Sequence, residues 1–178
     1  IDVSSQIVPH GTPGVLPRVG NILRVPGRFE IVHYYGRGPH ENYTDRHASA
    51  RVGRFAAKVS DLYEPYILPQ EHGCRTGVRW FGLNNKRLGV LIRGAKPLQV
   101  TAAHYTVADL YAATHTYQLE PREETVLHID LHQRGLGSGS CGPDTLDKYK
   151  LMKQRYSFEY EMLLFDPRRD DPAVVARS

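Results

Sequence analysis

The stretch Tyr156-Ser-Phe-Glu-Tyr-Glu-Met-Leu-Leu164 decides the fold class, because apolar side chains recur along it at every second position. A period of two would scatter these side chains around a helix but aligns them on one face of a β-strand. The same alternation recurs over residues 29–35 and 125–131. Three half-buried strands are therefore predicted. The aligned faces of the other two are Phe29, Ile31 and Tyr35, and Leu127, Ile129 and Leu131.

A turn between two apolar runs predicts a β-hairpin. Val78–Leu83 and Arg87–Ile92 flank Asn84-Asn85. Asparagine tolerates the positive φ that tight hairpin turns demand, so we place the turn at these two residues. A further strand is expected over Leu98–Ala102.

Only one segment favours a helix. Thr106 can cap the N-terminus of a short helix over Val107–Ala113, and Asp109 closes a Thr-x-x-Asp capping box. Sixteen Gly and twelve Pro punctuate the rest of the chain. Many short strands, frequent turns and almost no helix argue for an all-β antiparallel sandwich rather than alternating βαβ units.

The length of 178 residues suits one domain with a substantial core. We place this domain at residues 1–165. Residues 166–178 are expected to form a flexible tail, because Pro167–Ser178 mixes Arg and Asp around two prolines without any period. The chain opens at Ile1, already in an alternating pattern, as if cut from something longer.

Bulk properties argue against several classes of protein. Apolar residues make up 40% and charged residues 24%, which is near the globular average. The formal net charge of +4 arises from interspersed basic and acidic residues, so no nucleic-acid partner is expected. No apolar stretch approaches the roughly 20 residues that cross a bilayer, so no membrane partner is expected. Cys74 and Cys141 are too few for a disulfide scaffold, which favours reduced thiols in a cytoplasmic protein.

Three ionisable residues lie on one face of the strand predicted over residues 125–131, the last of them one residue past its end. His128, Asp130 and His132 could form half of a metal or proton-transfer site. Neighbours spaced about 6.6–6.8 Å apart on a straight strand do not converge on one ion, however. A solvated polar face is the favoured interpretation, and no metal site is predicted.

A polar block, Gly36-Arg-Gly-Pro-His-Glu-Asn-Tyr-Thr-Asp-Arg46, directly follows an apolar strand. Its polar side chains could bind a sugar, but loops rich in Gly and Asp are first of all turns. We expect Asp45 and Arg46 to bond to the backbone and to each other. Asn42, Tyr43, Asp45 and Arg46 are therefore predicted to form a structural motif that does not touch substrate.

A second loop, Gly137-Ser-Gly-Ser-Cys-Gly142, matches the G-x-G-x-x-G pattern of dinucleotide-binding turns. Such a turn must open a helix, whereas Pro143-Asp-Thr145 follows here without a helical period. The nucleotide interpretation is therefore rejected. What remains is a flexible loop at a sheet end, which can bring its backbone close to a ligand.

Glycoside hydrolysis requires two carboxylates about 5–5.5 or 6.5–9.5 Å apart. None of six candidate glutamates lies in a setting that suggests a paired, buried site, so no catalytic residue is predicted. The candidates weighed are Glu41, Glu64, Glu71, Glu120, Glu123 and Glu124.

Several segments together resemble one enzyme family. Tyr35–Arg46 resembles the G-x-G-P-x-E-N-Y-x-D-R block of the small-chain domain in the large β-galactosidases of glycoside hydrolase family 2. Asp61–Gly73 matches its D-x-Y-x-P-Y-x-x-P-x-E-x-G stretch. Arg75–Arg79 resembles its next strand, and Gly135–Pro143 resembles its glycine loop. Order and spacing agree over nearly the whole chain, from Ile1 to about Phe165.

The resemblance implies a β-supersandwich of the galactose mutarotase-like type, set at the C-terminal end of a multidomain enzyme. The family module continues further on its N-terminal side, so we expect a truncated domain with unpaired strand edges that self-associates. The catalytic glutamates of the family lie in a separate TIM barrel, so the isolated chain is expected to be inactive. No cofactor is expected in this chain, because the Mg²⁺ and Na⁺ of the parent enzymes bind mostly outside this module.

The resemblance further implies a role for the glycine loop. The module is similar to one that leans over the barrel mouth and completes the pocket for a β-galactoside, so Gly139, Ser140 and Cys141 are the implied substrate-binding residues. Its partners would be the sugar and the other domains of the parent enzyme. Some relatives present a tryptophan for substrate stacking where this chain has Cys141. The loop Gly135–Gly142 is expected to be mobile and to be ordered only against the barrel.

Two other classes of function stay open. One is a free-standing carbohydrate-binding or mutarotase-like module, and the other is a basic scaffold that binds proteins. A TIM barrel with two glutamates upstream in the full-length gene would favour the galactosidase hypothesis. An independent start codon would favour the free-standing module.

Overall fold

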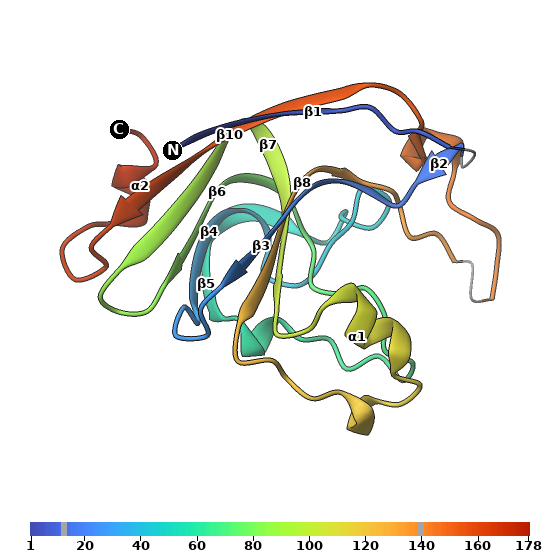
Figure 1. Cartoon of the computed structure of the whole chain (residues 1–178), viewed down its shortest axis with the longest axis horizontal. Coiled ribbons are helices and arrows are strands. Elements are labelled where there is room, and N and C mark those ends of the chain that lie inside the picture. The colour runs from blue at the N-terminus through green and yellow to red at the C-terminus, as the bar shows by residue number, and fades with distance from the viewer. Residues whose placement is uncertain (12–13, 139–140) are drawn as a thin grey trace.

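The computed structural model describes residues 1–11, 14–138 and 141–178, and it is an all-β sandwich, as the alternating pattern predicted (Figure 1). The strands are β1 (Asp2–Ile7), β2 (Val15–Leu16), β3 (Arg18–Val25), β4 (Ile31–Gly38), β5 (Arg51–Lys58), β6 (Arg75–Asn84), β7 (Gly89–Ala103), β8 (Thr125–Gln133), β9 (Leu151–Met152) and β10 (Tyr156–Phe165). The helices are α1 (Val107–Ala112) and α2 (Pro172–Val175), with 3₁₀ turns at Ser60–Leu62, Thr116–Gln118 and Asp147–Tyr149. None of the helices in these described ranges is long and apolar enough to span a bilayer.

The long strand β7 organises the sandwich, because both of its layers share this strand. The first part of β7, up to Gly94, pairs with β10, whereas its last five residues pair with β8, and β6 follows it along both parts. One layer therefore runs β1-β10-β7-β6-β4-β5, and β7 continues into β8 and β3 (Figure 1). Gly94 lies where the chain turns between the two parts. A Cβ atom there would lie only 2.5 Å from the carbonyl oxygen of Lys96, so glycine is required at this position.

The hydrophobic core fills the space inside this bent sheet. Val32, Tyr34 and Phe81 enter it from β4 and β6, and Leu127 and Ile129 enter it from β8; all five are at most 1% exposed. The rings of Tyr34 and Phe81 stack with their centroids 6.2 Å apart. Full burial of a large apolar side chain contributes about 1.5–3 kcal/mol, so these contacts hold the layers together.

The strands at 29–35, 125–131 and 156–164 are confirmed, but the predicted buried face is wrong for β4 and for the last residue of the face on β10. In β4 the side chains of Val32 and Tyr34 face the core, whereas Tyr35 is 37% exposed. This segment is apolar on both faces, so its sequence period could not choose between them. In β10 the predicted core residue Leu164 is 71% exposed and its neighbour Phe165 is buried, because α2 covers the opposite face at this end of the strand.

The hairpin and the helix cap are confirmed, with one change in the turn. β6 and β7 pair as expected, but the residue with positive φ is Lys86, at 71°, and not an asparagine. Asn85 shapes the turn with its side chain, which accepts hydrogen bonds from two backbone N–H groups. At α1, Thr106 Oγ1 accepts from the N–H of Asp109 at 3.1 Å, and the Asp109 carboxylate accepts from the N–H of Thr106 at 2.8 Å.

The last segment makes contacts that a free tail would lack. α2 packs on the outer face of the sheet against a cluster formed by Trp80, Leu91 and Phe165. Nη1 of Arg93 donates to the carbonyl oxygen of Ala176 at 3.0 Å. The sequence showed no period here because a helix of four residues is too short to display one.

Within the described part of the chain, the eight-stranded sheet ends in three open edges, at β1, β3 and β5. β5 carries Arg51, Arg54 and Lys58 along its length. Charged side chains on an edge strand discourage pairing with another chain. β1 and β3 carry fewer charged side chains than β5 and are therefore the edges more open to pairing. Self-association stays a prediction.

The prediction of a solvated polar face on β8 is wrong for two of its three residues. His128 and Asp130 are 4% and 1% exposed, and only His132 is exposed. Arg18 lies over this face and donates to Asp130 Oδ2 at 2.6 and 3.2 Å and to Glu71 Oε2 at 3.2 Å. Burial raises the pKa of Asp130 to about 6, although Arg18 opposes this shift. Burial, together with Arg18, lowers the pKa of His128 to about 4.

Replacement of Asp130 should change how stability depends on pH. The pKa of Asp130 is about 6 in the folded protein against an ordinary 3.8, so the folded state holds this proton more tightly. The protonated Asp130 side chain therefore stabilises the folded state fully below about pH 4, and this stabilisation is lost as the pH rises through about 6. Relative to Asp130→Asn, the wild type should lose up to about 3 kcal/mol of unfolding free energy over this range.

Urea unfolding of both proteins at a series of pH values measures this difference. Arg18, Glu71 and His128 face Asp130 in both proteins, so the subtraction isolates the Asp130 carboxyl. A difference that grows in favour of the wild type with rising pH would contradict the prediction. It would mean that the ion pair with Arg18 outweighs burial.

Candidate functional site

The turn block, residues 36–46, is fixed to the sheet by Asn42. This side chain is fully buried and uses all of its hydrogen-bonding capacity. Its amide nitrogen donates to the carbonyl oxygens of Arg37 and His40 at 3.1 and 3.0 Å. Its oxygen accepts from both the backbone N–H and the hydroxyl of Thr76 in β6. Asn42 therefore joins the turn after β4 to the neighbouring strand.

A buried carboxylate, Glu41, organises the other side of the block. Glu41 accepts hydrogen bonds from Arg46 Nη2, from the hydroxyl of Tyr66 and, at 2.7 Å, from the N–H of Gly73. The Arg46 guanidinium also lies over the ring of Tyr43, 5.2 Å from its centroid. Burial raises the pKa of the Tyr43 hydroxyl well above its ordinary value. Glu41 was one of six unremarkable glutamates in the sequence, and the structure gives it the most hydrogen-bond donors of those six.

Asp45 reaches away from Arg46, contrary to the expectation that the two would bond to each other. Its carboxylate accepts from the N–H groups of Leu136 and Gly137 at 3.1 and 2.8 Å and from the hydroxyl of Thr145 at 2.9 Å. Burial of Asp45 opposes its ionisation, but these hydrogen bonds hold the pKa of its carboxyl below the ordinary value. Asp45 thus joins the turn block to the glycine loop, residues 135–142, about ninety positions later in the chain.

The base of the glycine loop is shaped around this carboxylate. A Cβ atom on Gly135 would lie 2.6 Å from Asp45 Oδ2, and one on Gly137 would lie 2.5 Å from the nitrogen of Thr145. Gly137 also has a φ of +66°, which side chains rarely allow. The N–H of Gly135 donates to the carbonyl oxygen of Tyr149 at 2.9 Å. The prediction that all order in this loop must come from another domain is therefore wrong for its base.

The predicted substrate-binding residues follow the base of this loop in the sequence. Gly139 and Ser140 lie outside the described residues. Cys141 is exposed, and its N–H donates to the carbonyl oxygen of Ser138 at 3.0 Å. Its thiol forms no disulfide, because the other cysteine, Cys74, is buried and also free. The loop therefore has a fixed base and carries a thiol at its exposed end.

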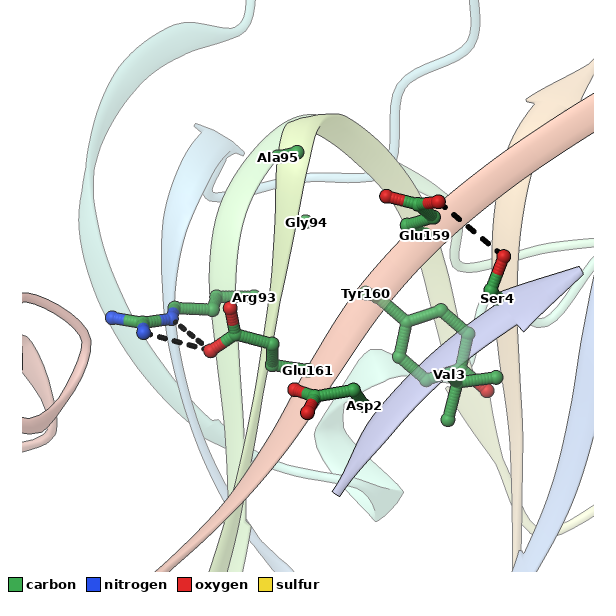
Figure 2. Close-up of a pocket in the computed structure, with 9 residues that line it drawn as sticks. All are labelled: Asp2, Val3, Ser4, Arg93, Gly94, Ala95, Glu159, Tyr160 and Glu161. Atoms are coloured by element: carbon green, nitrogen blue, oxygen red, sulfur yellow. Dashed lines mark hydrogen bonds and ion pairs between the residues drawn. The ribbon is translucent and has the colours of Figure 1, made fainter.

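A cavity of about 410 Å³ lies elsewhere, between β1, β10 and the bend of β7, and charged side chains at its walls are already engaged (Figure 2). Glu161 is paired with Arg93 at 2.7 Å, and Glu159 accepts from the hydroxyl of Ser4 at 3.3 Å. Tyr160 is only 3% exposed, so its ring offers no stacking face to a sugar. No described residue of the turn block or the glycine loop lines this cavity. It therefore does not belong to the predicted site.

Candidate metal ligands are scattered over the ranges that the structure describes. There, no three side chains of His, Cys, Asp or Glu are grouped so as to hold a metal ion. His128, Asp130 and His132 were the residues that the sequence offered as half of a metal or proton-transfer site, and Arg18 covers the first two of them instead.

Comparison with known proteins gives a consistent result. Residues 1–162 match the protein family described as beta galactosidase small chain. The chain is 33% identical over 147 residues to a beta-galactosidase of Staphylococcus xylosus, which covers 83% of this chain and 15% of that protein. It is 32% identical over 136 residues to a beta-galactosidase of Priestia megaterium, covering 76% and 13%. It is 33% identical over 149 residues to one of Vibrio cholerae, covering 84% and 14%. The chain thus spans about one seventh of the length of these relatives.

Removal of the Asp45 carboxylate should destabilise the chain by loosening the glycine loop from the turn block. Asp45→Ala would leave the N–H groups of Leu136 and Gly137 without their acceptor, at a cost of about 1–3 kcal/mol. Asp45→Asn keeps one acceptor oxygen and should lose less. Thermal and urea unfolding measure both effects.

The matched control is Asp147→Ala, since Asp147 is an exposed carboxylate with a single lysine partner. Its replacement should change stability by no more than about 0.5 kcal/mol. If Asp45→Ala left the melting temperature unchanged but abolished sugar binding by the parent protein, Asp45 would contact substrate and the structural role would be refuted.

Proposed function

The chain belongs to the β-galactosidase small-chain family, and we propose that it is a domain of a β-galactosidase that completes the sugar pocket over a separate catalytic TIM barrel. Hydrolysis of terminal β-D-galactosides is then an activity of the full-length enzyme. The role of this domain is to place the glycine loop against the sugar. Galactoside and barrel are its partners in this proposal.

The observation that supports this role is the hydrogen-bonded link from Asp45 to the glycine loop. A loop that positions a ligand needs a base held by residues that are themselves fixed. Asp45 anchors the start of the glycine loop, because its carboxylate accepts hydrogen bonds from the N–H groups of Leu136 and Gly137. Asn42, in the same turn block, is hydrogen-bonded to β6. The turn block therefore connects the loop that carries Cys141 to the rigid part of the sheet.

The engagement of the buried carboxylates supports placing the chemistry elsewhere. A glycosidase needs one carboxyl free to give a proton and another free to attack or to activate water. Glu41 is occupied by Arg46, Tyr66 and a backbone N–H, while Asp130 and Glu71 are held by Arg18. We therefore assign the catalytic carboxylates to other domains. We also assign to them the Mg²⁺ and Na⁺ that the parent enzyme would use.

Exposed apolar side chains near α1 offer a surface for those other domains. Ile67 is 93% exposed and Tyr111 of α1 is 92% exposed. The loop that carries Ile67 is packed beside the start of α1, because the rings of Tyr63 and Tyr105 lie 5.4 Å apart. Exposed apolar side chains that gather in one region of the surface typically mark an interaction site.

The isolated chain should show no turnover of a chromogenic galactoside above the buffer rate. The full-length enzyme under the same conditions is the positive control. Turnover by the isolated chain that is lost with Glu41→Gln but kept with Glu120→Gln would overturn the assignment of catalysis to other domains.

Substitution of Cys141 tests the position of the loop. Cys141→Trp in the full-length enzyme should tighten galactoside binding by about 0.5–1.5 kcal/mol, because it adds an aromatic face for the sugar. The inhibition constant for galactose measures this effect separately from kcat. Cys141→Ser keeps the size of the side chain and serves as the control. If KM, kcat and galactose inhibition ignored every substitution at Cys141, the pocket-completing role would be wrong.

A further inference from the structure

A row of side chains crosses the outer face of the larger layer in exact strand register. Each member pairs with the next one on the neighbouring strand, from β5 at one edge to β1 at the other. The row is Arg54, Tyr35, Trp80, Arg93, Glu161 and Asp2. Its basic half lies toward β5 and its acidic half toward β1. Figure 2 shows the boundary, where Arg93 of β7 reaches Glu161 of β10 beside Asp2.

The segment around α2 builds a wall over the basic half of this row. Arg54 is paired with Asp171 at 2.7 Å, and Arg93 donates to the carbonyl oxygen of Ala176 at 3.0 Å. These two contacts hold the segment at both ends. Between the wall and the sheet lies an open pocket of about 430 Å³. It is lined by Tyr35, Arg54, Arg79, Trp80, Arg93, Gly94, Ala173, Ala176 and Arg177.

The guanidinium groups in this pocket are held in place by the aromatic rings and the backbone. Arg79 lies over the ring of Tyr35, 5.3 Å from its centroid, and donates to the carbonyl oxygen of Gly77 at 2.6 Å. Arg54 lies over the ring of Trp80 at 5.9 Å. Nε of Arg177 donates to a backbone carbonyl of α2. Each contact uses one side of a guanidinium and leaves other N–H groups available to a ligand.

Among the described residues, the pocket has more arginines in its lining than carboxylates paired with them. Arg54 and Arg93 have carboxylate partners in Asp171 and Glu161. Arg79 and Arg177 make no ion pair with any carboxylate in the described ranges. Two of the four arginines in the lining therefore have no ion-pair partner among the described residues, although Arg177 helps to hold the pKa of the Asp171 carboxyl below its ordinary value.

We propose that this pocket binds a phosphate-bearing small molecule. A phosphate monoester carries about −1.5 to −2 charges at neutral pH, which matches the two unpaired arginines. The planar forks of guanidinium groups fit phosphate oxygens in a bidentate way. The pocket volume is within the range of about 300–1,000 Å³ that is typical of small-molecule sites. The uncovered part of Tyr35 provides an apolar surface for the rest of the ligand.

This site is separate from the galactoside site proposed above. α2 lies at one end of the molecule and the segment leading to Cys141 lies at the other (Figure 1). A ligand at the arginine pocket would therefore bind without blocking the glycine loop, and the two proposals can fail independently.

The pocket contains its own reporter, because Trp80 is the only tryptophan of the chain. Inorganic phosphate and glucose 6-phosphate are titrated separately into the chain at constant ionic strength, with chloride and glucose as controls. We expect a saturable change in Trp80 fluorescence with a Kd of about 1 mM or tighter. Tighter binding of glucose 6-phosphate would mean that the sugar part uses the Tyr35 wall, and equal binding would mean that phosphate alone is recognised.

Matched variants locate the binding. Arg79→Gln and Arg177→Gln should each weaken phosphate binding about tenfold or more, because each removes one charge-assisted contact. Arg87→Gln, in the exposed turn between β6 and β7, should leave it unchanged. Melting temperatures establish that the variants are folded, and Arg79→Gln alone is decisive if Arg177→Gln releases α2. Absence of binding by both fluorescence and calorimetry, or equal Kd values for Arg79→Gln and Arg87→Gln, would overturn the proposal.

Discussion

The sharing of β7 between the two layers is the constraint on which the rest of the structure depends. Because one strand pairs with β10 and then with β8, the two layers cannot shift independently. The bend at Gly94 is possible only without a side chain. It also sets the relative position of two loops, since the turn block follows β4 in one layer and the glycine loop follows β8 in the other. Asp45 can bridge these loops because the sheet brings them within hydrogen-bonding distance.

Polar groups are buried at this end of the sandwich; the central ones are hydrogen-bonded, whereas buried side-chain atoms of Thr44, His72 and His128 have no partner among the described residues. Burying a carboxylate is costly unless it is paired and hydrogen-bonded. Glu41, Asp130 and Asn42 each meet this condition through partners from distant parts of the chain. Such partners permit few alternative arrangements, so the cluster specifies one geometry for the loops even where its net contribution to stability is small. The start of the glycine loop is therefore held in one defined position.

The opposite end of the molecule is organised differently. There the outer face of the sheet is covered by a short helix that depends on apolar contacts with Trp80 and on two arginine contacts. Arginine stacked on an aromatic ring retains donors for other partners. Arg54 and Arg93 hold the helix segment at this end, while Arg79 and Arg177, which form no ion pair with a described residue, leave positive charge beside an open pocket.

The sequence by itself determined the all-β class, the hairpin, the helix cap and the family, because each depends on local periods, caps or motifs that need no distant partner. Only the tertiary structure decided which face of β4 is buried, since that strand is apolar on both sides. It also decided that Asp130 is buried under Arg18, and that Asp45 holds Gly137 rather than Arg46. These contacts join residues 91 or more positions apart. No local pattern encodes such a contact, because the partner is supplied only when the bent sheet brings distant loops together.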